Sequence, residues 1–293
     1  MNQIIYSIIF TLSLLLGDGP EKHLFKKNTD LIITSDSETF SEMSFGADYM
    51  MFTSSMRHND EYYPVADNKN YEQKMITTFL SVISTTRRND KVKINYDLQK
   101  LKGCIFSHYI DSMGVSDLVE GNNDIAKEMI ESSSGTSMIF GGGSHEINHI
   151  YPFGDSLRSV GEAWQTIEEE AEIEEDNGAM GNYVGITTTI LNYTFKKIKE
   201  KKGELIAYID LVSTITSRGT TTTWEEEYEV EFSGAVEAKI RFNLTRGYTI
   251  RNKATIYLKG INKNLKTDET NTMFINAETS TKNKYKYKKG INE

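Results

Sequence analysis

The sequence predicts a mainly β protein, a two-part antiparallel curved sheet or half-barrel with one or two short helices. The first observation is that apolar and polar residues alternate almost without interruption from residue 181 to residue 259. Such alternation is typical of strands with one wet face and one covered face. The second is that turn-forming pairs, Ser233-Gly234 and Arg246-Gly247, divide this stretch into runs. The third is that only one stretch of the chain has convincing helical periodicity.

An apolar run from Ile4 to Leu16 begins the chain. Its length is that of a signal-peptide core, too short to span a bilayer as a lone helix. Residues 1–17 are therefore expected to be a signal peptide. The protein would then be periplasmic or secreted, with no transmembrane span in the mature chain. Because residues 1–3 contain no Lys or Arg, a buried first strand or helix is the alternative.

Residues 18–140 are predicted to form the N-terminal β half. The polar stretch from Arg57 to Asn70 is expected to be a loop. Cys104 is expected to be a small apolar filler that faces the same way as Phe106 and Ile110. Apolar or alternating runs predict strands at Leu31–Ile33, Met43–Met56, Lys74–Arg87, Val92–Leu98, Cys104–Asp111 and Val115–Glu120.

The helix is predicted at residues 123–132, with Asn122 or Asn123 as its N-cap and Ile125 on its apolar stripe. A Ser-Gly-rich run follows, so residues 141–160 are expected to be a linker. The acidic run from Glu168 to Asp176 is expected to be a solvated loop. It lacks the spacing of an EF-hand calcium loop.

Residues 161–293 are predicted to form the C-terminal antiparallel β half. Alternating Lys and Tyr residues between Lys282 and Lys289 favour an edge strand protected by lysines. The long strands are expected to turn one apolar face inward, where it is either core or a ligand groove. The residues expected on that face are Tyr228, Val230, Phe232, Val236, Ile240, Phe242, Tyr248, Ile250, Ile256 and Leu258.

Composition argues against nucleic-acid binding and rules out an intrachain disulfide. The formal net charge of -9 argues against a nucleic-acid binder, because the only basic cluster is the one from Lys282 to Lys289. Cys104 is the single cysteine, so no intrachain disulfide can form.

A Val-Gly-Glu-x-Trp box at Val160 to Trp164 follows a turn-marked strand, a short helix and a Pro-containing linker. In this order the chain resembles a family of uncharacterised bacterial exported proteins and lipoproteins, whose box usually has Asp-Ser where this chain has Glu162-Ala163. The resemblance implies a fold similar to the curved half-barrels of periplasmic lipoprotein carriers, and it implies no catalytic residues. On physical grounds, Gly161 permits a tight turn and Trp164 is expected to plug an end of the sheet.

One motif could carry chemistry. His145-Glu146-Ile147-Asn148-His149 matches H-E-x-x-H, in which two histidines bind zinc and the glutamate acts as the base. Three glycines precede it and Pro152 follows it, which leaves about one turn for the helix that the motif requires. His23, His58 and His108 have no partner nearby in the sequence that would suggest a catalytic triad.

The sequence therefore favours a non-catalytic exported envelope protein with no cofactor. Its expected partner is a lipid or another apolar ligand, or a second envelope protein. A zinc metallopeptidase that uses His145, Glu146 and His149 is one alternative. A structural or interaction module without a ligand is the other.

Overall fold

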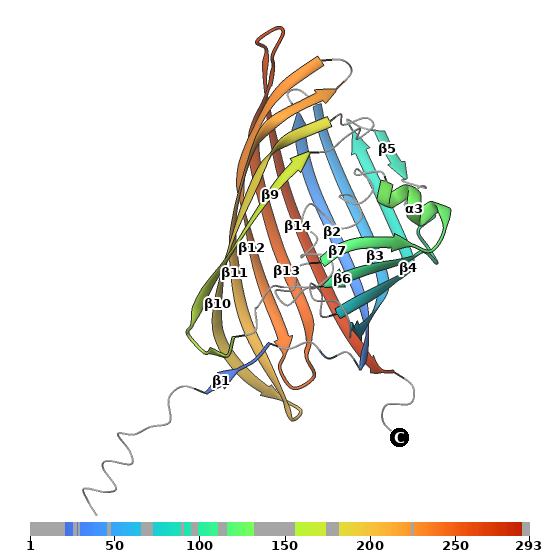
Figure 1. Cartoon of the computed structure of the whole chain (residues 1–293), viewed down its shortest axis with the longest axis vertical. Helices are drawn as coiled ribbons and strands as arrows, with labels where there is room; N and C mark the ends of the chain where they lie inside the picture. Colours follow the sequence, from blue (N-terminus) through green and yellow to red (C-terminus); the bar gives the residue numbers. More distant parts are fainter. Residues whose placement is uncertain are drawn as a thin grey trace, which may run out of the picture.

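The computed structural model describes residues 21–25, 28, 30–45, 48–65, 73–88, 91–94, 99–110, 116–131, 156–173, 182–223 and 226–288. Most of these residues lie in strands (Figure 1). The strands of the N-terminal half are β1 (Lys22–His23), β2 (Leu31–Phe45), β3 (Asp48–Pro64), β4 (Gln73–Arg88), β5 (Lys91–Ile94), β6 (Ile105–Ile110) and β7 (Ser116–Gly121). Those of the C-terminal half are β8 (Arg158–Ser159), β9 (Ala163–Ile173), β10 (Asn182–Lys201), β11 (Glu204–Thr223), β12 (Glu226–Asn243), β13 (Tyr248–Asn264) and β14 (Thr270–Tyr287).

Twelve of these strands form one antiparallel sheet that curves without closing, as Figure 1 shows. Its order is β7-β6-β4-β3-β2-β14-β13-β12-β11-β10-β9, with β5 beside β4. Apart from the β2–β14 and β4–β6 pairs, neighbours along this path follow each other in the chain. The predicted class, a curved antiparallel sheet in two parts, is confirmed.

The two halves of the sheet join where β14 pairs with β2, from Tyr287 opposite Leu31 to Met273 opposite Phe45. The prediction of an edge strand at the C-terminal lysines is therefore wrong, because β14 is flanked by β13 and β2. Lys282, Lys284 and Lys286 alternate with inward-facing residues and are exposed on the other face. Alternation describes the faces of a strand but says nothing about its position in a sheet.

The side of the sheet that carries the even-numbered residues of β12 from Tyr228 to Phe242 is called the inner face here. Three buried clusters lie on this face. The largest covers β10 to β13 and includes Phe25, whose ring packs edge-on against Phe195 and Phe242 with centroids 5.2 and 5.5 Å apart. Phe25 follows the short strand β1, which pairs with β8.

Helix α3 (Asp124–Glu131) is the only helix in the ranges given above apart from single turns, and it confirms the predicted helix. Asn123 caps it, because its Oδ1 accepts a hydrogen bond from the N–H of Ala126 at 2.8 Å. Ala126 is buried in a cluster with Cys104 and Phe106, whereas Ile125 is exposed. No helix in the described part of the chain is long and apolar enough to cross a membrane.

The Val160 to Trp164 box forms the turn into β9. Gly161 has a φ of +90° and donates its N–H to the carbonyl of Phe195 at 2.7 Å. Arg158 lies over the ring of Trp164, and that ring stacks on Tyr193 with centroids 5.2 Å apart. Trp164 therefore covers one end of the largest cluster.

Four predicted boundaries are wrong. The strand predicted at Met43–Met56 is divided between two strands, because β2 ends at Phe45 and β3 begins at Asp48. Strand β3 continues to Pro64, through the first part of the expected loop. Strand β9 continues to Ile173, through most of the acidic run. Strand β12 passes through Ser233-Gly234 without a break.

Candidate ligand-binding face

A row of apolar residues crosses the inner face from β11 to β3. Backbone pairing joins Ile215 to Gly234, Gly234 to Leu258, Leu258 to Ile275, Ile275 to Met43, and Met43 to Met50. The rows on either side extend it into an apolar floor of half-buried side chains. These are Ile215, Val230, Phe232, Ile256, Leu258, Met273, Ile275, Met43, Met50 and Phe52.

Two glycines shape this floor. A Cβ on Gly234 would lie 2.0 Å from the carbonyl oxygen of Tyr257 and 2.6 Å from a methyl group of Leu258. A Cβ on Gly260 would lie 2.3 Å from the carbonyl oxygen of Glu231 and 2.7 Å from the Cβ of Phe232. Leu258 and Phe232 thus lie directly over the glycines of the neighbouring strand, which only glycine allows.

The inner face predicted from the sequence divides into core and floor. Val236, Ile240 and Phe242 are buried in the largest cluster, and Tyr248 is buried in another. The side chains that remain half-buried are Tyr228, Val230, Phe232, Ile250, Ile256 and Leu258. The ten residues therefore do not form one groove, because Phe25 and its neighbours cover part of the face.

A second feature of the inner face is a polar belt that crosses the sheet from β13 to β6. Its side chains are uncharged except around Asp60, and each is at most 6% exposed. The belt consists of Thr249, Asn252, Thr281, Asn283, Ser35, Ser37, His58, Asp60, Thr77 and His108.

Asp60 lies at the centre of the polar belt. Its carboxylate accepts hydrogen bonds from Thr77 Oγ1 at 2.7 Å and from Ser35 Oγ at 3.4 Å, and His58 Nε2 lies 3.1 Å away. Burial lowers the pKa of the nearby His108 to about 4, although the charge of Asp60 acts in the opposite direction. Ser35 contacts the carboxylate and not the imidazole, so these residues do not have the geometry of a catalytic triad.

The sequence offered no triad partner for His58 and His108, and in the fold both side chains lie close to Asp60. Strands β3 and β6 bring both side chains to Asp60. Within the described ranges, no group of three or more His, Cys, Asp and Glu residues is arranged to hold a metal. Asp60, His58, Ser35 and Thr77 form a buried polar network.

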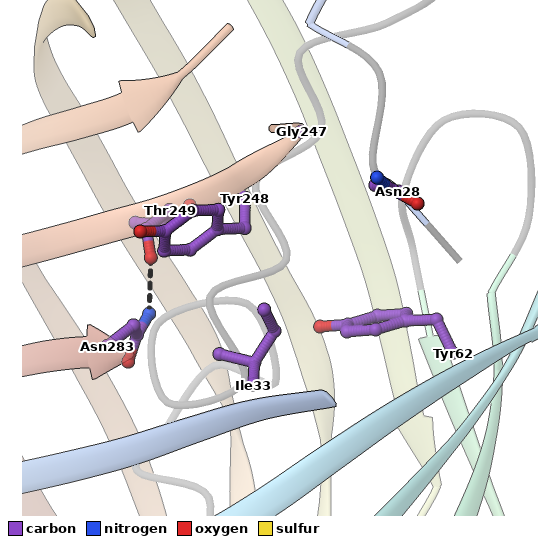
Figure 2. A pocket seen from close by; sticks show the side chains of 7 residues that line it. All are labelled: Asn28, Ile33, Tyr62, Gly247, Tyr248, Thr249 and Asn283. Carbon is purple, nitrogen blue, oxygen red and sulfur yellow. Dashed lines mark hydrogen bonds between the residues drawn. The ribbon is translucent and has the colours of Figure 1, made fainter. Parts of the chain in front are cut away.

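A small pocket lies at one end of the polar belt (Figure 2). Its volume of about 10 Å³ suits one water-sized group. Asn283 Nδ2 donates to the carbonyl of Thr249 at 2.6 Å. Among the residues that the structure describes, neither Asn283 Oδ1 nor Thr249 Oγ1 has a hydrogen-bond partner. The lining residues are Asn28, Ile33, Tyr62, Gly247, Tyr248, Thr249 and Asn283.

The pocket carries no charge. Burial raises the pKa of Tyr248 to about 12, and burial together with the charge of Asp60 raises the pKa of Tyr62 well above its ordinary value. Both phenols therefore stay protonated at neutral pH. In Figure 2 the hydroxyl of Tyr62 points toward Ile33, and Asn283 lies on the other side of Ile33.

The H-E-x-x-H motif, with His145, Glu146 and His149, lies outside the described residues, as does the predicted signal peptide. Cys104 is fully buried, as expected of an apolar filler.

No protein-family model matches the chain, and no curated protein matches it. Among solved structures, Salmonella typhi OmpF in complex with daunomycin is 9% identical with a TM-score of 0.23, over 87% of this chain and 99% of that chain. A loop L8 deletion mutant of OmpT, an outer membrane protein of Vibrio cholerae, is 5% identical with a TM-score of 0.22, over 87% of this chain and all of that chain. Similarities this weak carry no argument about this protein.

Proposed function

We propose that this protein is a non-catalytic protein of the cell envelope that binds an acyl chain or a similar apolar ligand on the inner face of its sheet. The observation that carries the proposal is the apolar floor. Ten half-buried apolar side chains from β11, β12, β13, β14, β2 and β3 form one continuous surface.

The binding energy available on such a surface is sufficient for a ligand. An acyl chain that buries roughly 300 Å² of apolar area gains about 7 kcal/mol before the entropic cost of association. The outer face offers no comparable surface on the central strands, because β12, β13 and β14 present exposed charges there. These include Glu229, Glu231, Glu237, Lys239, Lys253, Lys259, Glu278 and Lys282.

The envelope location rests on the apolar run at Ile4 to Leu16 and on the resemblance of the Val160 to Trp164 box to exported proteins. Export and removal of the leader are therefore parts of the proposal. Amino-terminal sequencing of protein recovered from its own compartment tests them, since a cleaved leader gives a chain that begins near Asp18.

The ligand is tested by substitutions on the two faces of β13. Leu258→Gln places a polar group on the apolar floor, whereas Tyr257→Gln changes the exposed neighbour on the outer face. We expect native mass spectrometry to find co-purified lipid in the wild-type and Tyr257→Gln proteins and to find it lost or strongly reduced in Leu258→Gln. Because Phe242 is fully buried, it is unsuitable for this test, since its substitution would damage the core.

Circular dichroism and urea unfolding of both variants provide the control. A Leu258→Gln protein that keeps its fold and loses its lipid supports the proposal. If the wild-type protein is empty and binds no alkyl probe, the apolar floor is covered by the protein itself, and the chain is a structural or interaction module.

A further inference from the structure

A group of lysines and arginines lies on the outer face of the sheet, at the end of the long strands that is lower in Figure 1. The backbone register brings them together from β10, β12, β13 and β14. Arg251 is half-buried, and the others are exposed. The basic patch consists of Lys197, Lys199, Lys239, Arg241, Arg251, Lys253, Lys282 and Lys284.

Like charges face each other across the strands of the basic patch. Arg241 lies directly opposite Arg251, and Arg251 lies opposite Lys282. Two residues further along the same strands, Lys239 lies opposite Lys253. Directly opposed like charges destabilise a sheet. A bound anionic group would relieve this repulsion, so the arrangement favours a negatively charged partner.

Tyr208 of β11 lies between the cations of β10 and those of β12. The charged groups of Lys197 and Arg241 each lie 5.3 Å from the centre of its ring, and that of Lys199 lies 5.8 Å away. Cation–π contacts thus hold three positive side chains around one half-buried ring. Tyrosine is also common at the headgroup level of membranes, where its amphipathic ring is favoured.

The carboxylates that lie among these cations are already paired. Asp36, opposite Lys282, accepts hydrogen bonds of 2.6 and 3.1 Å from Arg57, which lies outside the basic patch. The other ion pairs are Asp210 with Lys196 at 3.8 Å and Glu278 with Lys253 at 3.9 Å. The basic patch therefore keeps an excess of positive charge.

The charges of the outer face are also segregated along the strands. On β12 the outward-facing charges are negative from Glu227 to Glu237 and positive at Lys239 and Arg241. The chain as a whole has a formal net charge of -9. An anionic surface would therefore attract one end of the sheet and repel the other, which orients the molecule on that surface.

From these observations we infer that the basic patch docks the protein on a membrane surface rich in anionic phospholipids. From β10 to β14 the patch spans about 19 Å at the usual strand spacing, which is wider than one phosphate and suits several head groups. Phosphate groups between the opposed cations would offset their repulsion. The inference does not depend on the proposed ligand, because the basic patch and the apolar floor lie on opposite faces of the sheet.

Sedimentation of the full-length protein with lipid vesicles tests the inference. The probes are vesicles of phosphatidylcholine alone and vesicles in which about one-third of the lipid is phosphatidylglycerol. We expect at least about tenfold tighter binding to the anionic vesicles. That preference should disappear when the salt concentration rises from about 0.05 M to about 0.5 M, because salt screens exposed charges.

Two double variants locate the contact. Arg241→Gln combined with Lys253→Gln removes two exposed cations of the basic patch. Arg218→Gln combined with Lys259→Gln is the matched control, because it removes two exposed cations from the other end of the outer face. Each Lys or Arg near an anionic membrane contributes about fivefold to affinity, so we expect the patch variant to bind anionic vesicles about twentyfold more weakly. The control should change by less than about threefold.

Three results would overturn the inference. They are equal binding of the wild-type protein to both kinds of vesicle, equal losses in the two double variants, and binding of soluble polyphosphate without binding of anionic vesicles. The last result would identify the partner as a soluble polyanion. None of them bears on the apolar floor, whose ligand is tested separately by the lipid that co-purifies with the Leu258→Gln protein.

Discussion

Asp60 is the most costly polar residue to bury on the inner face, since its side chain is fully enclosed. The fold compensates by directing three polar side chains at its two oxygens, from β2, β3 and β4. A buried carboxylate with several such partners fixes strand register, because a one-residue slip would turn every partner to the other face.

The first prediction at the residue scale concerns this carboxylate. Asp60→Asn replaces an oxygen acceptor with a donor and disrupts hydrogen bonds to a charged group, so we expect a loss of about 2 to 3 kcal/mol in the free energy of unfolding. Urea denaturation measures it. Asp36→Asn is the matched control, because Asp36 pairs with Arg57 on the outer face of the same two strands, where both side chains are largely exposed. If Asp36→Asn lowers the free energy of unfolding as much as Asp60→Asn does, burial of the Asp60 carboxylate is not the cause of the loss.

The second prediction concerns pH. Burial lowers the pKa of His108 to about 4 in the folded protein, from an ordinary value of 6.5 that applies when the chain is unfolded. The unfolded chain thus binds the proton more tightly, and stability is lost as the pH falls through this window. The full loss is about 3 kcal/mol, reached below pH 4.

Urea unfolding at pH 7.5 and pH 4.5 tests it, with His108→Gln as the comparison. The variant should lose distinctly less stability between the two pH values than the wild-type protein. Equal losses would show that other groups cause the acid sensitivity.

Sequence reasoning did not find the polar belt, and the reason is physical. His58 and Asp60 on β3 occupy inward-facing positions where alternation predicts apolar residues, so the pattern resembles a loop. Their partners Thr77 and His108 come from other strands, and only the register of β3, β4 and β6 brings them together. The alternation of β12, and of β13 from Asn252 onward, in contrast, correctly predicted the inner and outer faces because it depends on local geometry alone. A bulge at Ile250 turns Thr249 to the inner face, although alternation predicted it on the outer one.

At the scale of elements, the close approach of β12 and β13 depends on Gly234 and Gly260. Large side chains of the opposite strand cover both glycines. The Ser233-Gly234 pair was expected to end a strand, because Gly is a strong turn signal. In the structure Gly234 lets the side chain of Leu258 pack directly against the backbone of β12.

The third prediction tests that role. Gly234→Ala would place a methyl group 2.0 Å from the carbonyl oxygen of Tyr257, so the two strands must separate. We expect a loss of about 2 to 3 kcal/mol in the free energy of unfolding. Ser233→Ala, at the exposed neighbouring position, should change stability little. Chemical denaturation of both variants decides between a tight packing site and an ordinary strand position.

At the scale of the whole molecule, the pairing of β2 with β14 joins residues far apart in the chain. Ser37 and Thr281, whose hydroxyl oxygens are 3.2 Å apart, are separated by 244 residues. Single-sequence reasoning predicted two β halves but could not predict this contact, because alternation carries no information about which strands pair.

The fourth prediction uses this pairing. A circular permutant that links Lys288 to Glu21 by a short flexible linker, with new ends between Gly143 and Ser144, makes β14 and β2 near neighbours in the chain. Because local pairings form faster than distant ones, we expect the permutant to keep its far-ultraviolet spectrum and to refold several-fold faster. Stopped-flow refolding measures this, with the wild-type chain as the reference. A permutant that refolds more slowly would show that another step limits folding.

The position of β14 between β13 and β2 also bears on chains that are made only in part. A ribosome that stops before residue 270 leaves both neighbours with long unpaired backbones, and such edges readily attract other strands. A chain without β14 therefore differs sharply from one that contains it, because proteases and chaperones recognise exposed strand edges. Strand β14 in this way protects the backbone edges of both β13 and β2.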